Sequence, residues 1–312
     1  ICFNAPATPE SDVINLISKP LDLPSAPEGA DDRFMYTDGE LVTTFLRELA
    51  AASYGQDPGC VTVGEMSSTS IERCVEYSHP ESGALSMVFN FHHLKVDYAD
   101  GKKWSLARFE LGDLRRVLME WAEGMQAGGG WNALFWNNHD QPRAVSRFGD
   151  DSPAFRVASA KTLGTVLHLH QGTPYVYQGE ELGMTNSYFT DISEYEDLES
   201  VNYHAEALSL GLEAEAVLHS LSVKSRDNAR TPMQWDDSPN AGFSVAEPWL
   251  PLSEDWATRN VEGQRSDPAS MLTLHRRLLA LRRDHPALAI GDYRGVPLGI
   301  ADVFAYERFA GD

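Results

Sequence analysis

Three acidic residues stand where predicted β-strands end: Asp12, Glu65 and Asp140. Glu65 closes the segment 61–65, and Asp140 follows the apolar run 133–137. In a barrel of alternating strands and helices, the C-terminal strand ends form one face. Carboxyl groups that converge there suit glycoside hydrolysis, which needs one nucleophile and one proton donor. Because acidic residues also favour helix N-termini, helix capping is the alternative role for each.

Short apolar runs alternate with longer segments of helical periodicity, and this alternation predicts an α/β fold. The runs are apolar on both faces, which is typical of parallel strands that helices cover on both sides. Either a βα-barrel or an open doubly wound sheet fits, but no glycine-rich phosphate loop follows a strand, which disfavours a dinucleotide-binding sheet. We expect strands at 61–64, 85–91, 133–137 and 174–177, and helices at 39–53, 111–126, 153–170 and 269–283.

Two further segments differ from this alternation. Residues 187–223 are acidic and weakly patterned, which predicts a long excursion between a strand and a helix. From about residue 286 the pattern becomes β-like. The pattern therefore predicts a strand–helix domain over 1–285 and the start of a C-terminal β-sandwich domain over 286–312.

The composition restricts the partners. A net charge of −21 disfavours nucleic acid, because the acidic surface repels phosphate backbones. No apolar run of membrane-spanning length occurs, and the first residues lack a basic and apolar leader, so we expect a cytoplasmic protein that binds no membrane. The cysteines, Cys2, Cys60 and Cys74, are expected to be free thiols.

No cofactor or metal is predicted. His92 and His93 would point to opposite faces of a strand, so they are not expected to bind one metal together. No calcium loop of the Asp-x-Asp-x-Asp-Gly kind is found. Glu180 and Glu181 are interpreted as capping or ion-pairing groups.

Five longer motifs resemble glycoside hydrolase family 13, the α-amylase superfamily. Segment 12–15 (Asp-Val-Ile-Asn) is similar to the end of its nucleophile motif, 61–66 to its acid/base motif and 138–143 to its transition-state-stabiliser motif. Segments 172–184 and 226–235 resemble the last barrel strand and a downstream motif of the oligo-1,6-glucosidase-like branch. The resemblance implies a partial (β/α)8 TIM barrel that contains roughly strands four to eight.

The same resemblance assigns roles. Asp12 is the expected nucleophile, Glu65 the expected general acid/base and Asp140 the expected stabiliser of the oxocarbenium-like state, while His139 is expected to bond the same sugar. A nucleophile and an acid/base about 5–5.5 Å apart would hydrolyse with retention. The substrate is then a small carbohydrate.

The substrate has two candidates within this branch. Segments 65–70 and 89–98 resemble the subfamily that hydrolyses trehalose 6-phosphate, and Val13 is typical of branches that cleave α-1,6 or trehalose-type links. Asn137 departs from that subfamily, which commonly has Cys there, and agrees with oligo-1,6-glucosidases. A phosphate would need cations near the leaving group. Four residues are candidates, each with a surface or ion-pair role as its alternative: Lys95, Arg143, Arg147 and Arg230.

The resemblance weakens before Asp12. The family motif has Arg two residues before its nucleophile, whereas Glu10 stands there in this chain. About five of eight barrel strands are expected, so the barrel would have open edges. We expect the chain on its own to be poorly active and aggregation-prone, and a catalytically inactive family member is the alternative of another functional class.

Overall fold

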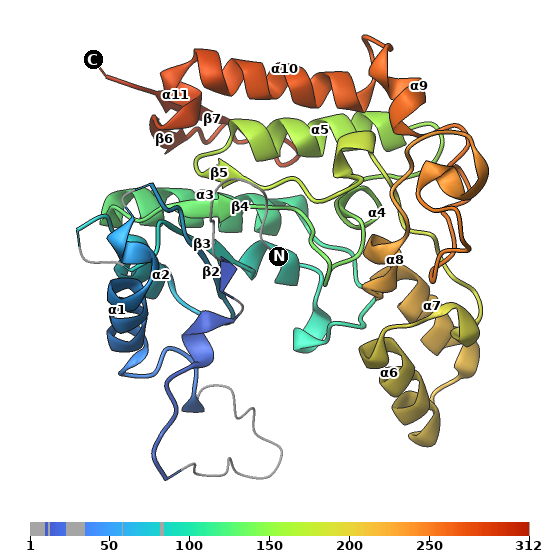
Figure 1. The fold of residues 1–312 in the computed structure, drawn as a ribbon, viewed down its shortest axis with the longest axis horizontal. Helices are drawn as coiled ribbons and strands as arrows, with labels where there is room; N and C mark the ends of the chain where they lie inside the picture. The colour runs from blue at the N-terminus through green and yellow to red at the C-terminus, as the bar shows by residue number, and fades with distance from the viewer. Residues whose placement is uncertain (1–9, 12, 23–34, 58, 82–83, 312) are drawn as a thin grey trace.

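The fold is built on a parallel sheet of five short strands. The computed structural model describes residues 10–11, 13–22, 35–57, 59–81 and 84–311. The strands follow chain order in the sheet, β1-β2-β3-β4-β5, and each neighbouring pair is parallel. Helical segments connect successive strands, as Figure 1 shows. The predicted α/β class and partial TIM barrel are confirmed. The strands are β1 (Glu10–Ser11), β2 (Val63–Met66), β3 (Met87–Asn90), β4 (Asn132–Leu134) and β5 (Thr173–Pro174).

Four of the strands overlap the predicted runs with bounds shifted by one to three residues, and β1 was not among the predicted runs. β4 ends at Leu134, and two residues later Trp136 donates from Nε1 to the backbone oxygen of Leu163 in α5 at 2.8 Å. β5 ends before Tyr177, whose N–H donates to a Glu180 carboxyl oxygen at 3.2 Å and not to a neighbouring strand. Apolar composition thus predicts where four of the strands lie but not the residues at which they end.

The predicted helices are present within a few residues of the expected bounds. α2 begins after Ser70, whose side chain accepts the N–H of Arg73, and α10 begins after Ser270, whose side chain accepts the N–H of Thr273. Side-chain oxygens at these positions satisfy N–H groups that have no partner in the first turn. The helices around the sheet are α1 (Val42–Ala52), α2 (Ile71–Ser78), α3 (Leu111–Gly128), α4 (Ala144–Phe148), α5 (Arg156–Leu169) and α10 (Met271–Asp284).

Two apolar clusters hold the sheet to its helices. In the first, Phe89 and Phe135 from the strand side meet edge to face with ring centroids 5.0 Å apart, and Leu114, Leu163 and Leu167 pack with them. The second joins the beginning of the sheet to α1, α2 and α3. Its buried members are Ile14, Val42, Leu46, Met66, Cys74, Tyr77, Leu85, Val88, Trp121 and Met125.

The segment between β5 and α10 contains more structure than its sequence predicts. α6 (Leu198–Ser209) and α7 (Ala214–Lys224) form a helical pair that projects away from the sheet in Figure 1. Their apolar side chains pack with Phe189 and Tyr195 in a small core of their own. Short helices follow: α8 (Asp227–Arg230) and α9 (Val261–Arg265). The segment is thus a long excursion between a strand and a helix, as expected, and it contains two helices that its weak pattern does not predict.

The last residues form a short helix and an antiparallel hairpin. α11 spans Pro286–Ala289, and β6 (Asp292–Gly295) pairs with β7 (Tyr306–Phe309). The β-like pattern thus corresponds to the hairpin, while a domain boundary at 285 stays a prediction. Within the described residues, no helix combines the length and the apolar character that crossing a membrane requires.

Candidate active site

Two of the expected catalytic carboxyls, Glu65 and Asp140, lie at one edge of the sheet. All five strands are parallel, so their C-terminal ends lie at one edge, which we call the strand-end edge. Glu65 is the third residue of β2 and is 6% exposed, and Asp140 lies in the loop that follows β4. Asp12 directly follows β1 in sequence but lies outside the described residues. Topology therefore brings Glu65 and Asp140 to the same edge.

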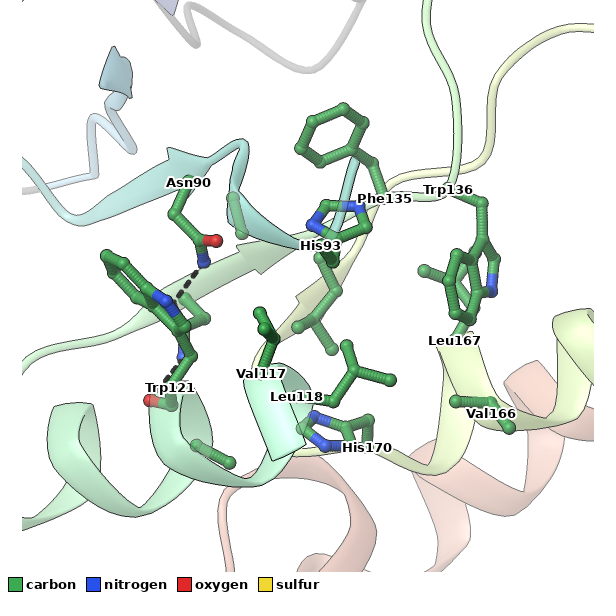
Figure 2. A pocket seen from close by; sticks show the side chains of 14 residues that line it. Asn90, His93, Val117, Leu118, Trp121, Phe135, Trp136, Val166, Leu167 and His170 are labelled. Atoms are coloured by element: carbon green, nitrogen blue, oxygen red, sulfur yellow. Dashed lines mark hydrogen bonds between the residues drawn. The ribbon is translucent and has the colours of Figure 1, made fainter. Parts of the chain in front are cut away.

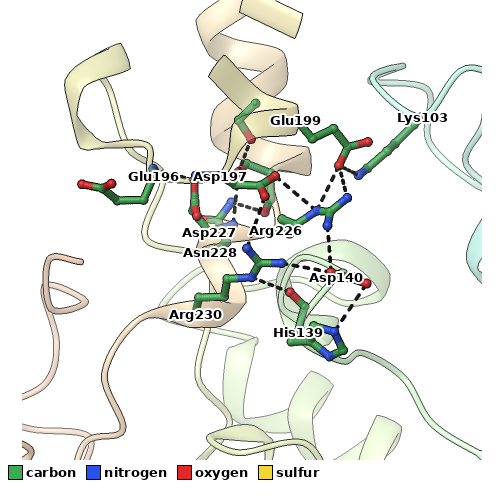
Figure 3. A network of polar contacts seen from close by, with 12 residues as sticks. Lys103, His139, Asp140, Glu196, Asp197, Glu199, Arg226, Asp227, Asn228 and Arg230 are labelled. Carbon is green, nitrogen blue, oxygen red and sulfur yellow. Dashed lines mark hydrogen bonds and ion pairs between the residues drawn. The ribbon is translucent and has the colours of Figure 1, made fainter. Parts of the chain in front are cut away.

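Asp140 is held by two arginines on one of its oxygens. Oδ1 accepts from Nη1 of Arg226 at 2.9 Å and from Nη2 of Arg230 at 3.0 Å, as Figure 3 shows. Oδ2 lies 3.5 Å from Nε2 of His139. The backbone N–H of Asp140 donates to Oδ1 of Asn138 at 2.8 Å, which fixes the loop. The Asp140 side chain is still 37% exposed, so a ligand can reach it.

Three more charged residues surround these arginines. Arg226 donates to Oε2 of Glu199 from Nε at 3.0 Å and from Nη2 at 2.5 Å. Asp197 joins the two guanidinium groups, with contacts of 3.2 Å to Nε of Arg226 and 3.2 Å to Nη1 of Arg230. Lys103 pairs with Glu199 as well. We call Asp140, Arg226, Arg230, Asp197, Glu199 and Lys103 the Asp140 cluster.

Ion pairing within the Asp140 cluster favours the charged forms of Glu199 and Arg226. Burial raises the pKa of Glu199, but the bonds and charges of Lys103 and Arg226 outweigh burial and lower that pKa overall. Burial lowers the pKa of Arg226, and its carboxylate partners outweigh that effect and raise it. A carboxylate held this way can accept sugar hydroxyls and stabilise positive charge in front of it.

One helical turn explains why both arginines face Asp140. Arg226 is the N-cap of α8 and Arg230 is its last residue, and residues four positions apart lie on the same helix face. Asp227 is fully buried, and its Oδ2 accepts the N–H of Glu196 at 3.2 Å and of Asp197 at 3.1 Å. Burial raises the pKa of Asp227. These bonds fix the segment that carries Asp197 next to the arginines.

Arg143 lies apart from the Asp140 cluster. Its side chain is 1% exposed, and it donates to the backbone oxygens of Gln178 at 2.5 Å and Asn228 at 3.2 Å. A third bond reaches Oγ1 of Thr231 at 3.4 Å. Burial lowers the pKa of Arg143 to about 10. This guanidinium ties three segments together in the interior, and its position is that of a structural residue.

The remaining expected cations have different surroundings. Arg147 forms a bidentate salt bridge with Asp97, with hydrogen bonds of 2.8 and 2.9 Å. Lys224 donates to the same carboxylate at 2.5 Å. This ion-pair group is almost fully buried. Lys95 lies instead at the strand-end edge, 3.3 Å from Oγ of Ser68 in the loop after β2. Lys95 and Arg230 are thus the two expected cations on the side of Glu65 and Asp140.

Sequence reasoning missed most of the Asp140 cluster. Arg226 belongs to the motif 226–235, and its four-residue spacing from Arg230 was a usable signal. Asp197, Glu199 and Lys103 lie in segments with no recognisable motif, and only the fold brings them to the arginines. His92 and His93 lie in the short helix η4 (His92–Lys95) and not on a strand. Within the described ranges, no group of three or more His, Cys, Asp or Glu residues is placed to hold a metal.

A small cavity between the sheet and its helices is not part of this site. Figure 2 shows it bordered by His93, Trp121, Phe135 and His170, among others. Its volume is about 40 Å³, which is the scale of a water molecule, whereas ligand pockets measure roughly 300–1,000 Å³. Burial lowers the pKa of His93 to about 3 and of His170 to about 4, so both are neutral there. The cavity is a packing gap in the core.

Comparisons with known proteins identify the family and the fold. Residues 11–291 match the family described as alpha amylase, catalytic domain. A trehalose-6-phosphate hydrolase from Bacillus subtilis is 48% identical over 297 residues, which are 95% of this chain and 52% of that protein. An oligo-1,6-glucosidase from Halalkalibacterium halodurans is 41% identical over 302 residues, 95% of this chain and 53% of that protein.

A solved structure has the same fold. The crystal structure of Bacillus licheniformis trehalose-6-phosphate hydrolase superposes with a TM-score of 0.89 at 47% identity, over 96% of this chain and 54% of that one. The chain spans about half the length of the curated relatives it matches.

Proposed function

The chain belongs to the α-amylase catalytic-domain family, glycoside hydrolase family 13, and from this premise we propose that the protein hydrolyses trehalose 6-phosphate to glucose and glucose 6-phosphate with retention. The observation that carries the proposal is the Asp140 cluster, in which two arginines fix one carboxylate at the same edge as Glu65. Retaining hydrolysis needs two carboxyl groups and a stabilised positive transition state at one place.

The proposed reaction proceeds in two displacements. Asp12 attacks the anomeric carbon and forms a glycosyl-enzyme ester while Glu65 donates its proton to the departing sugar oxygen. Water then attacks the same carbon, Glu65 accepts the proton of that water, and the ester bond to Asp12 breaks. Glu65 is thereby protonated again, and glucose leaves in the configuration of the substrate.

Asp140 and its partners are proposed to act on the glucosyl ring. The carboxylate would accept ring hydroxyls and stabilise the positive charge that develops at the anomeric carbon, and His139 would bond the same sugar. Arg226 and Arg230 hold the Asp140 carboxylate through one of its oxygens. Because the carboxylate is oriented before substrate binds, less reorganisation is needed in the transition state.

The choice of trehalose 6-phosphate rests on the relatives and on the cations. Two trehalose-6-phosphate hydrolases are 47–48% identical to this chain, compared with 41% for an oligo-1,6-glucosidase. Lys95 lies beside the loop that follows β2, where a phosphorylated leaving sugar would meet it. Asn137 favours the second candidate, an oligo-1,6-glucosidase that acts on isomalto-oligosaccharides.

The test uses the 312-residue chain and a chimera in which these residues are joined to the parts of the Bacillus subtilis relative outside the match. Each protein is incubated with trehalose 6-phosphate, and phosphorus NMR follows the formation of glucose 6-phosphate. Proton NMR at early times identifies the anomer of the released glucose. We expect α-glucose first, from the chimera in particular. Release of β-glucose first, or no cleavage by either protein, would overturn the proposal.

A further inference from the structure

Asn15 and Ser67 join two loops at the strand-end edge by reciprocal hydrogen bonds. Nδ2 of Asn15 donates to the backbone oxygen of Ser67 at 2.7 Å, and the N–H of Ser67 donates to Oδ1 of Asn15 at 3.1 Å. Asn15 is completely buried. Because one backbone residue satisfies both ends of the amide, the amide plane is fixed and the two loops move together.

These loops are the ones that adjoin the two expected reacting carboxyls. Asn15 lies in η1 (Ile14–Leu16), shortly after β1 and three positions after Asp12. Ser67 directly follows β2 and stands two positions after Glu65. The bonded pair therefore spans the ends of β1 and β2, which are neighbouring parallel strands.

The backbone beside each partner is held in an uncommon conformation. Val13 has φ 40° and Ser68 has φ 53°, both in the left-handed region. That region is unfavourable for residues with a side chain, above all for a β-branched one such as Val. Such conformations persist where the surrounding structure fixes them, and they concentrate at functional sites. The Asn15–Ser67 bonds are part of what fixes these two turns.

Side-chain packing beneath the Asn15–Ser67 bonds also holds the loop after β1 against β2. Ile14 is 4% exposed and lies against Gly64, the residue before Glu65. A Cβ on Gly64 would come 3.1 Å from Cγ2 of Ile14 and 2.6 Å from Cδ1 of Leu85. The absence of a side chain at Gly64 thus allows the segment around Asn15 to lie directly on β2.

We propose that Asn15 is a positioning residue for the two expected reacting carboxyl groups, Asp12 and Glu65, because it holds the loop after β1 to the loop that follows Glu65. This inference rests on the proposed function, which assigns the reaction to those two groups. Retaining hydrolysis needs them about 5–5.5 Å apart. A displacement of about 1 Å can lower a rate about 10²-fold. Asn15 is completely buried and its side chain bonds the backbone of Ser67, so it acts through the loops after β1 and β2.

The test compares Asn15→Ala with Asn260→Ala in the chimera. Asn260 is also buried, at 4% exposure, and also bonds backbone: its Oδ1 accepts the N–H of Gly263 at 2.9 Å, and Nδ2 donates to the oxygen of Trp256 at 3.1 Å. Both variants should lower the melting temperature. Only Asn15→Ala should lower kcat, by about 10²-fold or more relative to the parent chimera, while its KM stays within about 3-fold of the parent value. It should also shift the basic limb of the kcat/KM pH profile, which Asn260→Ala should leave in place.

A second variant covers the case in which Asn15→Ala does not fold. Asn15→Asp has the same shape and keeps an acceptor for the Ser67 N–H while it loses the donor to the Ser67 oxygen, so it should give a smaller loss of kcat. Hydrogen exchange of the Ser67 amide, slow in the parent and faster in Asn15→Ala, reports the contact without any turnover.

The outcomes separate the two claims. If the parent chimera turns over trehalose 6-phosphate and Asn15→Ala keeps its kcat, or loses no more than Asn260→Ala, the positioning role is wrong and the proposed function stands. If the Ser67 amide is protected but the parent cleaves no substrate, the proposed function is wrong, and the positioning role is lost with it.

Discussion

Nη1 of Arg226 lies 2.9 Å from Oδ1 of Asp140, although the first residue precedes α8 and the second follows β4. The contact links the long excursion after β5 to the parallel sheet. It makes the position of the Asp140 carboxylate depend on residues far from it in sequence.

Replacement of Arg226 should therefore impair catalysis more than stability. Arg226→Lys keeps the charge but cannot reach Asp140, Asp197 and Glu199 together, because only the planar guanidinium presents several fixed donors. We expect kcat/KM for trehalose 6-phosphate to fall about 10–10³-fold in the chimera. Arg116→Lys is the control, since Arg116 also pairs with two acidic residues but is 56% exposed on α3. An equal loss in both variants would contradict the role of the Asp140 cluster.

Glu65→Ala should separate proton donation from nucleophilic attack. Without the acid, cleavage of trehalose 6-phosphate should fall by about 10²–10⁴-fold. An aryl glucoside whose leaving group needs no proton should still form the glycosyl-enzyme, seen as a burst of released phenol. Added azide should then speed the second step by replacing the water that Glu65 activates. If the variant cleaves both substrates equally slowly, Glu65 is not the acid/base.

The sequence predicts these parts unequally well. Short apolar runs place Glu65 and Asp140 at the ends of strands, but helix capping explains that pattern as well, and only the family motifs assign the two residues their roles. Asp197 and Glu199 were not identified, since their partner Arg226 is distant in the chain and a sequence pattern carries no spatial distance. Arg143 was expected at the substrate, yet it is buried and bonded to backbone oxygens. A motif identifies a residue that is used in a family, but burial decides what its side chain touches.

Glu180 should make the protein less stable as the pH rises. Burial raises the pKa of this carboxyl to about 8 from an ordinary value near 4.5. Between those values the unfolded chain has released the proton while the folded chain keeps it, so stability falls by up to about 1.4 kcal/mol per pH unit. Glu180→Gln mimics the protonated form and should remove most of this slope. Melting temperatures at pH 5.5, 6.5 and 7.5 measure it, with exposed Glu120→Gln as the control.

An unchanged slope in Glu180→Gln would show that Glu180 does not hold a proton in the folded protein. Burial also raises the pKa of Glu181, so some slope of the same sign is expected to remain.

His168 and His275 should make the protein less stable as the pH falls, which is the opposite of the effect expected for Glu180. Nε2 of His168 lies 2.8 Å from Nδ1 of His275 between α5 and α10, and burial lowers the pKa of each to about 4. From about pH 6.5 down to about 4 the unfolded chain binds protons that the folded pair does not, so stability falls as the pH falls. His275→Gln should flatten this loss in urea-unfolding midpoints between pH 7 and 5. Exposed His285→Gln should leave it unchanged, and a flattening in both variants would contradict the assignment.

The substrate preference of the chimera tests the central claim most directly. Initial rates with trehalose 6-phosphate and with isomaltose give two values of kcat/KM, whose ratio measures the difference in transition-state stabilisation. We predict a higher kcat/KM for trehalose 6-phosphate, and a larger loss for that substrate than for isomaltose when Lys95 is replaced by Gln. An equal or higher kcat/KM for isomaltose would contradict the account and identify the protein as an oligo-1,6-glucosidase.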